Sequence, residues 1–321
     1  MDNRTNRKNA MLFTNPESIP ISCGILPAAW IKYRDELDAI VHRFPELFGE
    51  QIEDRDYDQV SGTYVEGTHI DVWGCKWENM HHGMESIVTG HPVPTRDMIA
   101  DLKIPTVDAG CPHGFMYLRL QDLRGFEELM MDLAEEPPEL QILLDKVLEY
   151  NMRQVGLIRE RLRESGQKEQ MVYFGDDLGM QHSLPMSPKT WRKYLKPCYK
   201  ALYSGLKEDG HYIYMHTDGH ILEIIMDLKE CGVDVVNPQV RANGIDNLRD
   251  VCSGKICVDL DLDRQLFPFA SPSEIDAHIK EAAEKLGSSE GGLWLKAEIG
   301  QDVPLPNVEA ICSGLVKYAR L

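Results

Sequence analysis

A histidine and an aspartate stand two residues apart in the segment His216-Thr-Asp218, which directly follows an apolar run. Alternate residues of a β-strand point to the same side, so both side chains face one way if this segment ends a strand. Imidazole and carboxylate groups together can bind Zn²⁺ or a harder divalent metal. A hydrogen-bonded structural histidine, followed by an aspartate that caps a helix, explains the same residues equally well. Both interpretations stay open at this point.

A metal site needs a third ligand, and it has to come from another strand. Glu298 is our prediction, because it follows the apolar run that starts at Gly292. The adjacent acids Asp176 and Asp177 also follow an apolar run, and one of a pair of carboxyl groups can be held protonated as a general acid. Neighbouring residues on a strand face opposite ways, so only one of the two is expected to point into a site. A cap for the loop before Ser187 is the alternative.

Asp177 and His216 are therefore the predicted catalytic residues. The same group of strand ends carries further acidic and amide side chains, which we predict to bind substrate: Asp176, Gln181, Asn237, Gln239 and Asp259. The histidines of the irregular first half, which are His81, His82 and His113, are interpreted as solvent-exposed loop residues.

The second half of the chain alternates two hydrophobic periods, which is typical of strands that are each followed by a helix in a parallel sheet. The predicted strands are residues 171–174, 212–215, 233–236, 256–258 and 293–295. Helix starts are marked by Ser187-Pro188 and by the capping box Ser271-x-x-Glu274. In such sheets the chemistry lies where the strands end and the loops begin.

The first half is less regular. Residues 19–25 and 115–120 predict strands, residues 64–77 predict a β-hairpin, and residues 28–44, 124–135 and 139–164 predict helices. The total is about seven strands that precede a helix, one short of an eightfold barrel. The predicted fold is therefore α/β, a single (β/α)₈ TIM barrel domain over residues 1–321 with an elaborated N-terminal region.

Composition excludes several classes of function. The 321 residues include 34 basic and 52 acidic side chains, so the net charge of −18 disfavours binding to nucleic acid or to anionic membranes. No apolar run approaches the roughly 20 residues needed to span a bilayer, and the polar N-terminus does not resemble a secretion signal, so we expect a cytoplasmic protein. The eight scattered cysteines are expected to be free thiols. Motifs of nucleotide-binding proteins and serine hydrolases do not occur.

Several spaced segments together resemble the uroporphyrinogen decarboxylase superfamily. They are Gly175-Asp-Asp-Leu-Gly-Met-Gln181, Ser187-Pro-Lys-Thr-Trp-Arg-Lys-Tyr-Leu-Lys-Pro197, His216-Thr-Asp-Gly-His220, Gly232-Val-Asp-Val-Val-Asn-Pro-Gln239 and Asp302-Val-Pro-x-x-Asn307, with looser matches at Asp71-Val-Trp-Gly74 and Arg124-Gly-Phe-Glu127. The resemblance covers most of the chain. It implies a (β/α)₈ barrel with its site at the C-terminal rim.

The resemblance implies one of two chemistries. Some members decarboxylate a porphyrinogen without a cofactor, and they place an arginine-rich segment at the first strand, where this chain has Ile19-Pro-Ile-Ser-Cys-Gly-Ile-Leu-Pro-Ala28 with no arginine. Others transfer methyl groups to or from the cobalt of a corrinoid on a partner protein, often with zinc held by His-x-Cys and a distant Cys. His216 matches the zinc histidine, whereas Asp218 stands in place of Cys, and Glu298 lies near the expected position of the distant Cys.

Carboxylates in place of thiolates make a harder metal site. The resemblance thus favours the first methyltransferase component of an O-demethylase, which moves a methyl group from a methoxylated aromatic substrate to cobalt(I) of a partner corrinoid protein. In this hypothesis zinc or another divalent metal binds His216, Asp218 and Glu298 and stabilises the departing phenolate, while Asp177 positions the substrate or donates a proton.

The alternatives are a uroporphyrinogen decarboxylase-like lyase, a methyltransferase from methylcorrinoid to another acceptor, and a barrel that only binds a ligand. Trp30, Trp73, Phe115 and Met116 line an aromatic pocket or, as we favour, belong to the core. A homodimer is compatible with the sequence.

Overall fold

The computed structural model describes residues 2–50, 54–107 and 110–320. The chain divides into two compact units. Unit 1 comprises Met1–Gly67, Asn79–Ser86 and Asn237–Leu321, and unit 2 comprises Thr68–Glu78 and Ile87–Val236. The single domain expected over residues 1–321 stays a prediction.

A six-stranded sheet carries the predicted strands, in the order β1-β9-β8-β7-β6-β5. The pairs β1 with β9, β8 with β9 and β5 with β6 are parallel. The strands are β1 (Ile21–Ile25), β5 (Met171–Gly175), β6 (Tyr212–Thr217), β7 (Val235–Pro238), β8 (Cys257–Asp261) and β9 (Leu293–Ile299). All five strands expected in the second half are confirmed, as is the first one, at residues 19–25. An α/β fold with a parallel sheet is thus correct, and the eight strands of a full barrel stay a prediction.

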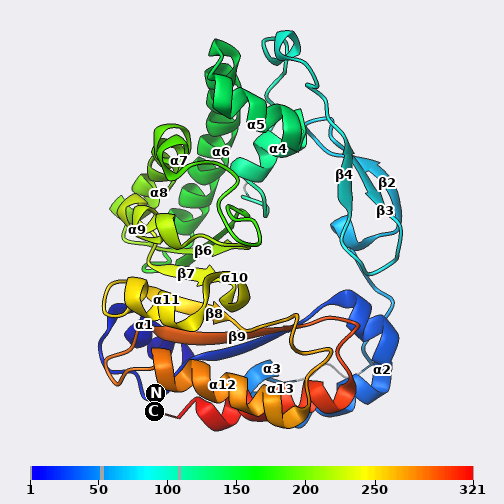
Figure 1. Ribbon diagram of the computed structural model, residues 1–321, viewed down its shortest axis with the longest axis vertical. Coiled ribbons are helices and arrows are strands. Elements are labelled where there is room, and N and C mark those ends of the chain that lie inside the picture. The colour runs from blue at the N-terminus through cyan, green and yellow to red at the C-terminus, as the bar shows by residue number, and fades with distance from the viewer. Residues whose placement is uncertain (1, 51–53, 108–109, 321) are drawn as a thin grey trace. The chain divides into compact units, whose positions relative to one another are not determined.

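In unit 1, helices α12 and α13 pack against each other, and α13 also packs on β1 and β9 (Figure 1). The capping box of Ser271 and Glu274 at the start of α12 is confirmed. The core between these elements contains Ile275, Ile279 and Ile311. The helices of this unit are α1 (Asn3–Leu12), α2 (Pro27–Val41), α3 (Pro45–Phe48), α10 (Val240–Asn243), α11 (Ile245–Cys252), α12 (Pro272–Leu286) and α13 (Leu305–Tyr318), with a short 3₁₀ helix at Gly62–Tyr64.

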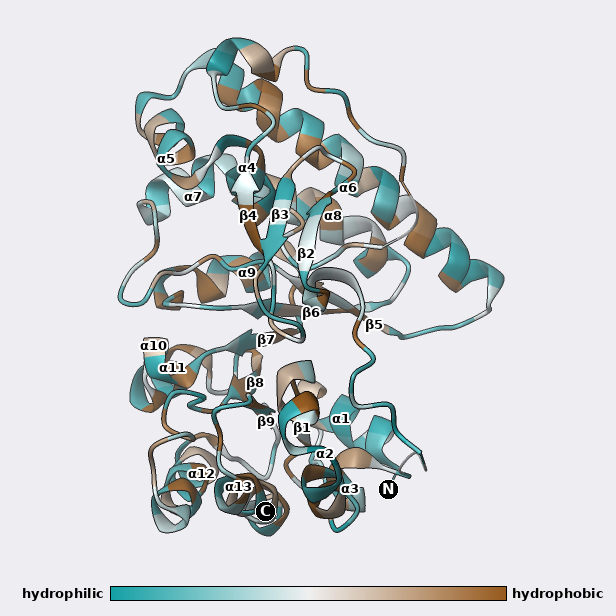
Figure 2. Cartoon of the chain, turned by 90° about the vertical axis from the view of Figure 1, so that its right-hand side faces the viewer, coloured by the Kyte–Doolittle hydropathy of each residue, from teal (hydrophilic) through white to brown (hydrophobic). Residues whose placement is uncertain are grey.

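In unit 2, the long helix α6 packs on α8, and α8 packs on β6. Figure 2 shows hydrophobic and hydrophilic residues mixed along α6, as expected for a helix with one buried side. The side chain of Ser187 caps α7, with Pro188 at its first position, as predicted. The helices are α4 (Tyr117–Arg124), α5 (Phe126–Glu135), α6 (Pro138–Glu164), α7 (Pro188–Tyr194), α8 (Lys196–Glu208) and α9 (Ile225–Cys231), with 3₁₀ helices at Arg96–Ile99 and Leu222–Ile224.

The hairpin expected at residues 64–77 is part of a three-stranded sheet of β2 (Gly67–Ile70), β3 (Lys76–Asn79) and β4 (Ile87–Gly90). The strand expected at residues 115–120 is wrong, because helix α4 begins at Tyr117. The backbone amides at the start of this helix donate hydrogen bonds to the carboxylate of Asp176, an acceptor that is far away in the sequence. A local apolar pattern carries no information about such a partner. Among the described residues, no helix is long and apolar enough to cross a bilayer, and all eight cysteines are free thiols, as expected.

A half-buried acid in unit 2 gives a pH-dependent prediction. Burial raises the pKa of Asp122 to about 6, although Arg119, 3.6 Å away, lowers it. A carboxyl group whose pKa is raised on folding costs no stability below its unfolded pKa, an increasing amount as the pH rises from there, and the full amount once the pH exceeds its folded pKa. The free energy of unfolding therefore falls between about pH 4 and pH 6 on account of this group.

Asp122→Asn is expected to remove this cost. Above pH 7 the variant should be more stable than the parent by about 2–3 kcal/mol, since a rise of about two pKa units, in which the attraction of Arg119 is already included, is worth about 3 kcal/mol. Below pH 4 the two proteins should be equally stable. Urea unfolding at pH 3.5 and pH 8 measures both differences, and a variant that is less stable at pH 8 would contradict the argument.

Candidate active site

The loops that follow β5 and β6 are hydrogen-bonded to each other. The amide of Asp176 donates to the carbonyl of His216 over 3.1 Å, and the amide of Gly179 donates to the carbonyl of Asp218 over 3.1 Å. The two chains approach so closely that a Cβ atom added at Gly219 would lie 2.2 Å from the carbonyl carbon of Gly179. Glycine at both positions thus allows the contact, and the two loops together form one support for the side chains that they carry.

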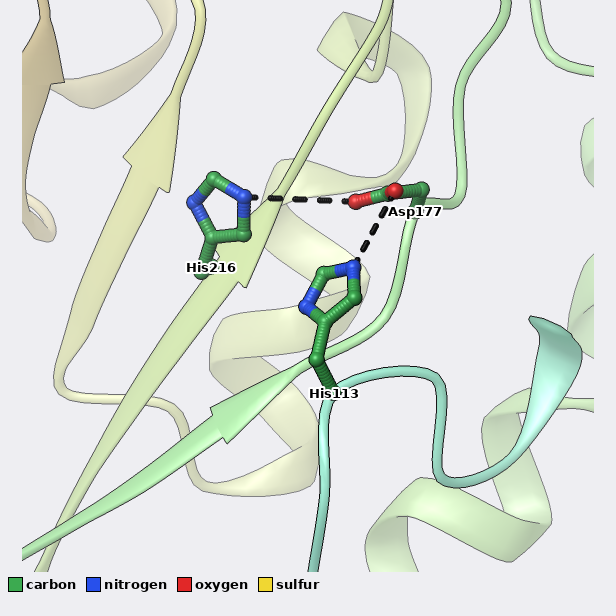
Figure 3. A group of neighbouring side chains, drawn as sticks. All are labelled: His113, Asp177 and His216. Atoms are coloured by element: carbon green, nitrogen blue, oxygen red, sulfur yellow. Dashed lines mark hydrogen bonds and ion pairs between the residues drawn. The ribbon is translucent and has the colours of Figure 1, made fainter. Parts of the chain in front are cut away.

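Three side chains meet above this support, and we call them the His-Asp-His cluster: His113, Asp177 and His216 (Figure 3). His113 Nε2 lies 3.1 Å from Asp177 Oδ2, and His216 Nε2 lies 4.0 Å from Asp177 Oδ1. Their ligand atoms all lie within 4.8 Å of one another. His113 comes from the loop before α4, Asp177 from the loop after β5, and His216 from the end of β6.

Asp177 is held in place by its neighbours. Its Oδ1 atom accepts a hydrogen bond from the backbone amide of Asp218 over 3.0 Å, while Oδ2 faces His113. The carboxylate of Asp218 lies 3.3 Å from His216 Nε2. Two of the residues that the sequence predicts as metal ligands, His216 and Asp218, therefore lie together, next to the predicted catalytic residue Asp177.

The imidazole of His113 lies over the end of β5 because residue 175 is a glycine. A Cβ atom at Gly175 would lie 2.4 Å from His113 Nδ1. We expect Gly175→Ala to displace this imidazole and to weaken binding of a divalent metal about tenfold or more, the size typical of changes that disturb ligand orientation. Titration with Zn²⁺ or Co²⁺ measures the effect. Gly156→Ala is a suitable control, since nothing lies within 4 Å of a Cβ atom there; equal affinity in both variants would contradict the prediction.

The donor set of the His-Asp-His cluster fits a divalent metal. Two imidazole nitrogens and one carboxylate oxygen are the protein ligands of many catalytic zinc sites, which leave a further position for water or substrate. The side chains are only partly buried, with Asp177 29% and His216 21% exposed, so an ion and a ligand can reach them. The residues present thus fit a metal with an open coordination position.

Asp176 faces away from this cluster into the helix layer. It is fully buried, and its oxygens accept hydrogen bonds from the backbone amides of Met116, Tyr117 and Leu118 and from the hydroxyl of Tyr199, at 2.5–3.1 Å. Burial raises the pKa of Asp176, and the donors from Tyr199, Leu118 and Tyr117 oppose the rise. The contacts in the structure are those of a cap for helix α4, and a role in substrate binding stays a prediction.

The remaining predicted residues lie on other elements. Gln181 is exposed on the loop after β5. In unit 1, the side chain of Asn237 donates to the backbone carbonyl of Asp259 over 2.6 Å, and Gln239 follows β7. Glu298 on β9 forms an ion pair with Arg264 at 2.5 Å. Substrate binding by Gln181, Asn237, Gln239 and Asp259 and metal binding by Glu298 stay predictions.

His113 is the residue of this site that sequence reasoning missed. Its irregular surroundings predict a solvent-exposed loop histidine, and the local signal for a site is its position between Pro112 and Gly114, both of which are typical of turns. Of the residues considered for an aromatic pocket, Trp73, Phe115 and Met116 are buried, which agrees with the core interpretation.

Comparisons with known proteins agree with this fold. A methyltransferase from Methanosarcina mazei superposes with a TM-score of 0.63 at 18% sequence identity, covering 97% of this chain and 98% of the other, so the two share a fold. A polysaccharide deacetylase from Bacillus cereus gives a TM-score of only 0.18 at 14% identity, covering 51% and 81% of the two chains, and has no bearing on the fold. Comparison with curated protein sequences gives no significant match.

Comparison with family models identifies the family of this chain. Residues 107–317 match the family model described as "Uroporphyrinogen decarboxylase (URO-D)", which is about two thirds of the chain and includes the whole His-Asp-His cluster. The chain belongs to the uroporphyrinogen decarboxylase family.

Proposed function

We propose that this protein is a methyltransferase that moves a methyl group from a methoxylated aromatic compound to cobalt(I) of a corrinoid carried by a partner protein. The observation that carries the proposal is the His-Asp-His cluster at the ends of two neighbouring strands. The methyltransferase from Methanosarcina mazei, which has this fold, supports the reaction class.

The metal in this proposal would be held by His113, Asp177 and His216. When bound, it supplies a Lewis acid for the ether oxygen of the substrate. The set His216, Asp218 and Glu298, expected from the sequence, is an alternative proposal that shares His216. Asp218 contacts His216 in either case.

The side chains of the cluster have separate tasks. His216 is fixed by its strand, and Asp177 is fixed by the amide of Asp218, so both are oriented before substrate arrives. His113 is the most exposed of the three, so it is the one that a ligand from solvent reaches most easily. During the reaction the bond between the methyl carbon and the aryl oxygen breaks, the bonding electrons stay with the oxygen, and the resulting phenolate takes up a proton.

The corrinoid is the nucleophile that accepts the methyl group, and no corrinoid motif occurs in this chain, so the proposal includes a partner protein. Transfer in the opposite direction, from methylcorrinoid to another acceptor, uses the same site. A decarboxylase-like lyase is the alternative; two of the described arginines of unit 2, the half-buried Arg119 and the buried Arg124, are already paired with Asp71 and Asp132.

The test uses the purified chain, free cob(I)alamin as the acceptor and a panel of methoxyphenols and methoxybenzoates. Loss of the cobalt(I) absorbance together with an equal amount of demethylated phenol is the expected result. His182→Ala is the matched control, because His182 is an exposed histidine of the same loop region outside the cluster. Failure of every methoxyarene, with cob(I)alamin and with corrinoid proteins alike, would refute the proposal.

A further inference from the structure

Two tyrosines lie in contact on the strands that carry the cluster. Tyr173 on β5 and Tyr214 on β6 are paired in the parallel register, and their ring centroids are 4.9 Å apart with an angle of 48° between the planes. Side chains alternate along a strand, so Tyr214 lies on the same side of the sheet as His216, two residues further on. The tyrosine pair and His216 thus share one face of unit 2.

The exposure of Tyr173 is unusual for its position. It is 60% exposed in the middle of a strand, whereas its neighbours Val172 and Phe174 are buried. Phe174 points to the opposite face, where its ring packs edge-on against Phe115 and Tyr203 in the helix layer. Tyr173 thus packs on Tyr214 with one part of its ring and leaves the rest accessible to a ligand.

The distance along β6 from Tyr214 to His216 suits a ligand with one aromatic ring. Two residues of a strand span about 6.5 Å, which is roughly the length of a benzene ring with one ether oxygen attached. A methoxyarene whose oxygen lies beside His216 would place its ring against the exposed ring of Tyr173, which packs on Tyr214. Ring-to-ring contact of this kind favours a flat aromatic ligand over an aliphatic one of equal size.

We infer that Tyr173 and Tyr214 form the subsite that binds the aromatic ring of the substrate. The inference deepens the proposed function and rests on it for the identity of the ligand. Tyr173 contributes the exposed ring, and Tyr214, which is almost fully buried, supports it from the neighbouring strand. Neither tyrosine is a ligand of the His-Asp-His cluster, so the subsite can be altered without altering metal binding.

The test measures equilibrium binding of 2-methoxyphenol, phenol and cyclohexyl methyl ether to the full chain without any corrinoid. Tyr173→Leu should weaken binding of both aromatic ligands about five- to tenfold, corresponding to about 1–1.4 kcal/mol, and leave the ether unchanged. Tyr173→Phe keeps the ring and should bind within about twofold of the parent. Phe269→Leu, which alters an 89% exposed aromatic residue in unit 1, is the matched control. Zinc content and thermal unfolding show that each variant is intact.

The possible results separate this inference from the proposed function. Unchanged binding in Tyr173→Leu would overturn the ring subsite. Equal losses of affinity in Tyr173→Leu and Tyr173→Phe would also overturn it, because they would show that the hydroxyl, and not the ring, contacts the ligand. Binding of aromatic ligands that depends on Tyr173, in a protein that transfers no methyl group, would support the subsite and refute the proposed function. A parent protein that binds no aromatic ligand would refute both.

Discussion

Asp176→Ala is expected to lower the free energy of unfolding by about 3–5 kcal/mol, the largest effect on stability that we predict for a single substitution. The substitution leaves three backbone amides and the hydroxyl of Tyr199 without their acceptor in a fully buried place. It also removes a negative charge from the N-terminus of α4, where the helix dipole favours one. Because proteins are stable by only about 5–15 kcal/mol, a loss of this size is a large part of the total.

Urea unfolding followed by circular dichroism measures the loss. Tyr199→Phe removes one of the four donors and should cost about 1 kcal/mol, which gives a graded comparison if Asp176→Ala does not fold. Asp101→Ala, at an exposed position of the same unit, is the control and should change stability by less than about 0.5 kcal/mol. If Asp176→Ala were as stable as this control and only ligand binding were lost, Asp176 would be a substrate residue, as the sequence suggested, and not a structural cap.

His216→Ala is expected to have the largest effect on activity. His216 belongs to both proposed ligand sets, so its removal takes away one of three protein ligands whichever set is correct. A Lewis acid at the leaving oxygen is worth several kcal/mol, so methyl transfer should fall about 10³-fold or more. Initial rates with cob(I)alamin and a saturating methoxyarene measure the loss in kcat.

Stability should be affected much less by this change. The His216 side chain is partly exposed, and the backbone hydrogen bond that joins its carbonyl to Asp176 does not depend on the imidazole. The variant should therefore unfold close to the parent in the absence of metal. A variant that keeps more than a tenth of the parent activity would contradict the role of His216 as a ligand of a catalytic metal.

The periodic parts of the fold could be predicted from sequence. The strands β5 to β9 and the caps at Ser187 and Ser271 depend on local patterns, that is, on alternation, apolar runs and capping residues. The error at residues 115–120 has a different origin, because the start of α4 is decided by a carboxylate about 60 residues away. A short stretch of sequence contains no information about tertiary contacts of this kind.

One part of the site could likewise be predicted from the sequence, and another part could not. His216, Asp218 and Asp177 follow strands, and the ends of neighbouring parallel strands meet, so their proximity could be expected. His113 lies in an irregular loop and reaches the site only because Gly175 leaves room for its imidazole. The exposure of Tyr173 could not be predicted either, since an aromatic residue within a strand pattern is typical of a core.

Metal content of the purified protein, determined by elemental analysis beside His113→Ala, His216→Ala and Glu298→Gln, tests the central claim most directly. We predict close to one equivalent of zinc or another divalent metal in the parent and in Glu298→Gln, and loss of the metal in both histidine variants. Loss in Glu298→Gln with retention in His113→Ala would instead support the ligand set His216, Asp218 and Glu298. A parent protein prepared without chelator that contains no metal, and that binds none on addition of Zn²⁺ or Co²⁺, would contradict metal-assisted methyl transfer at this site.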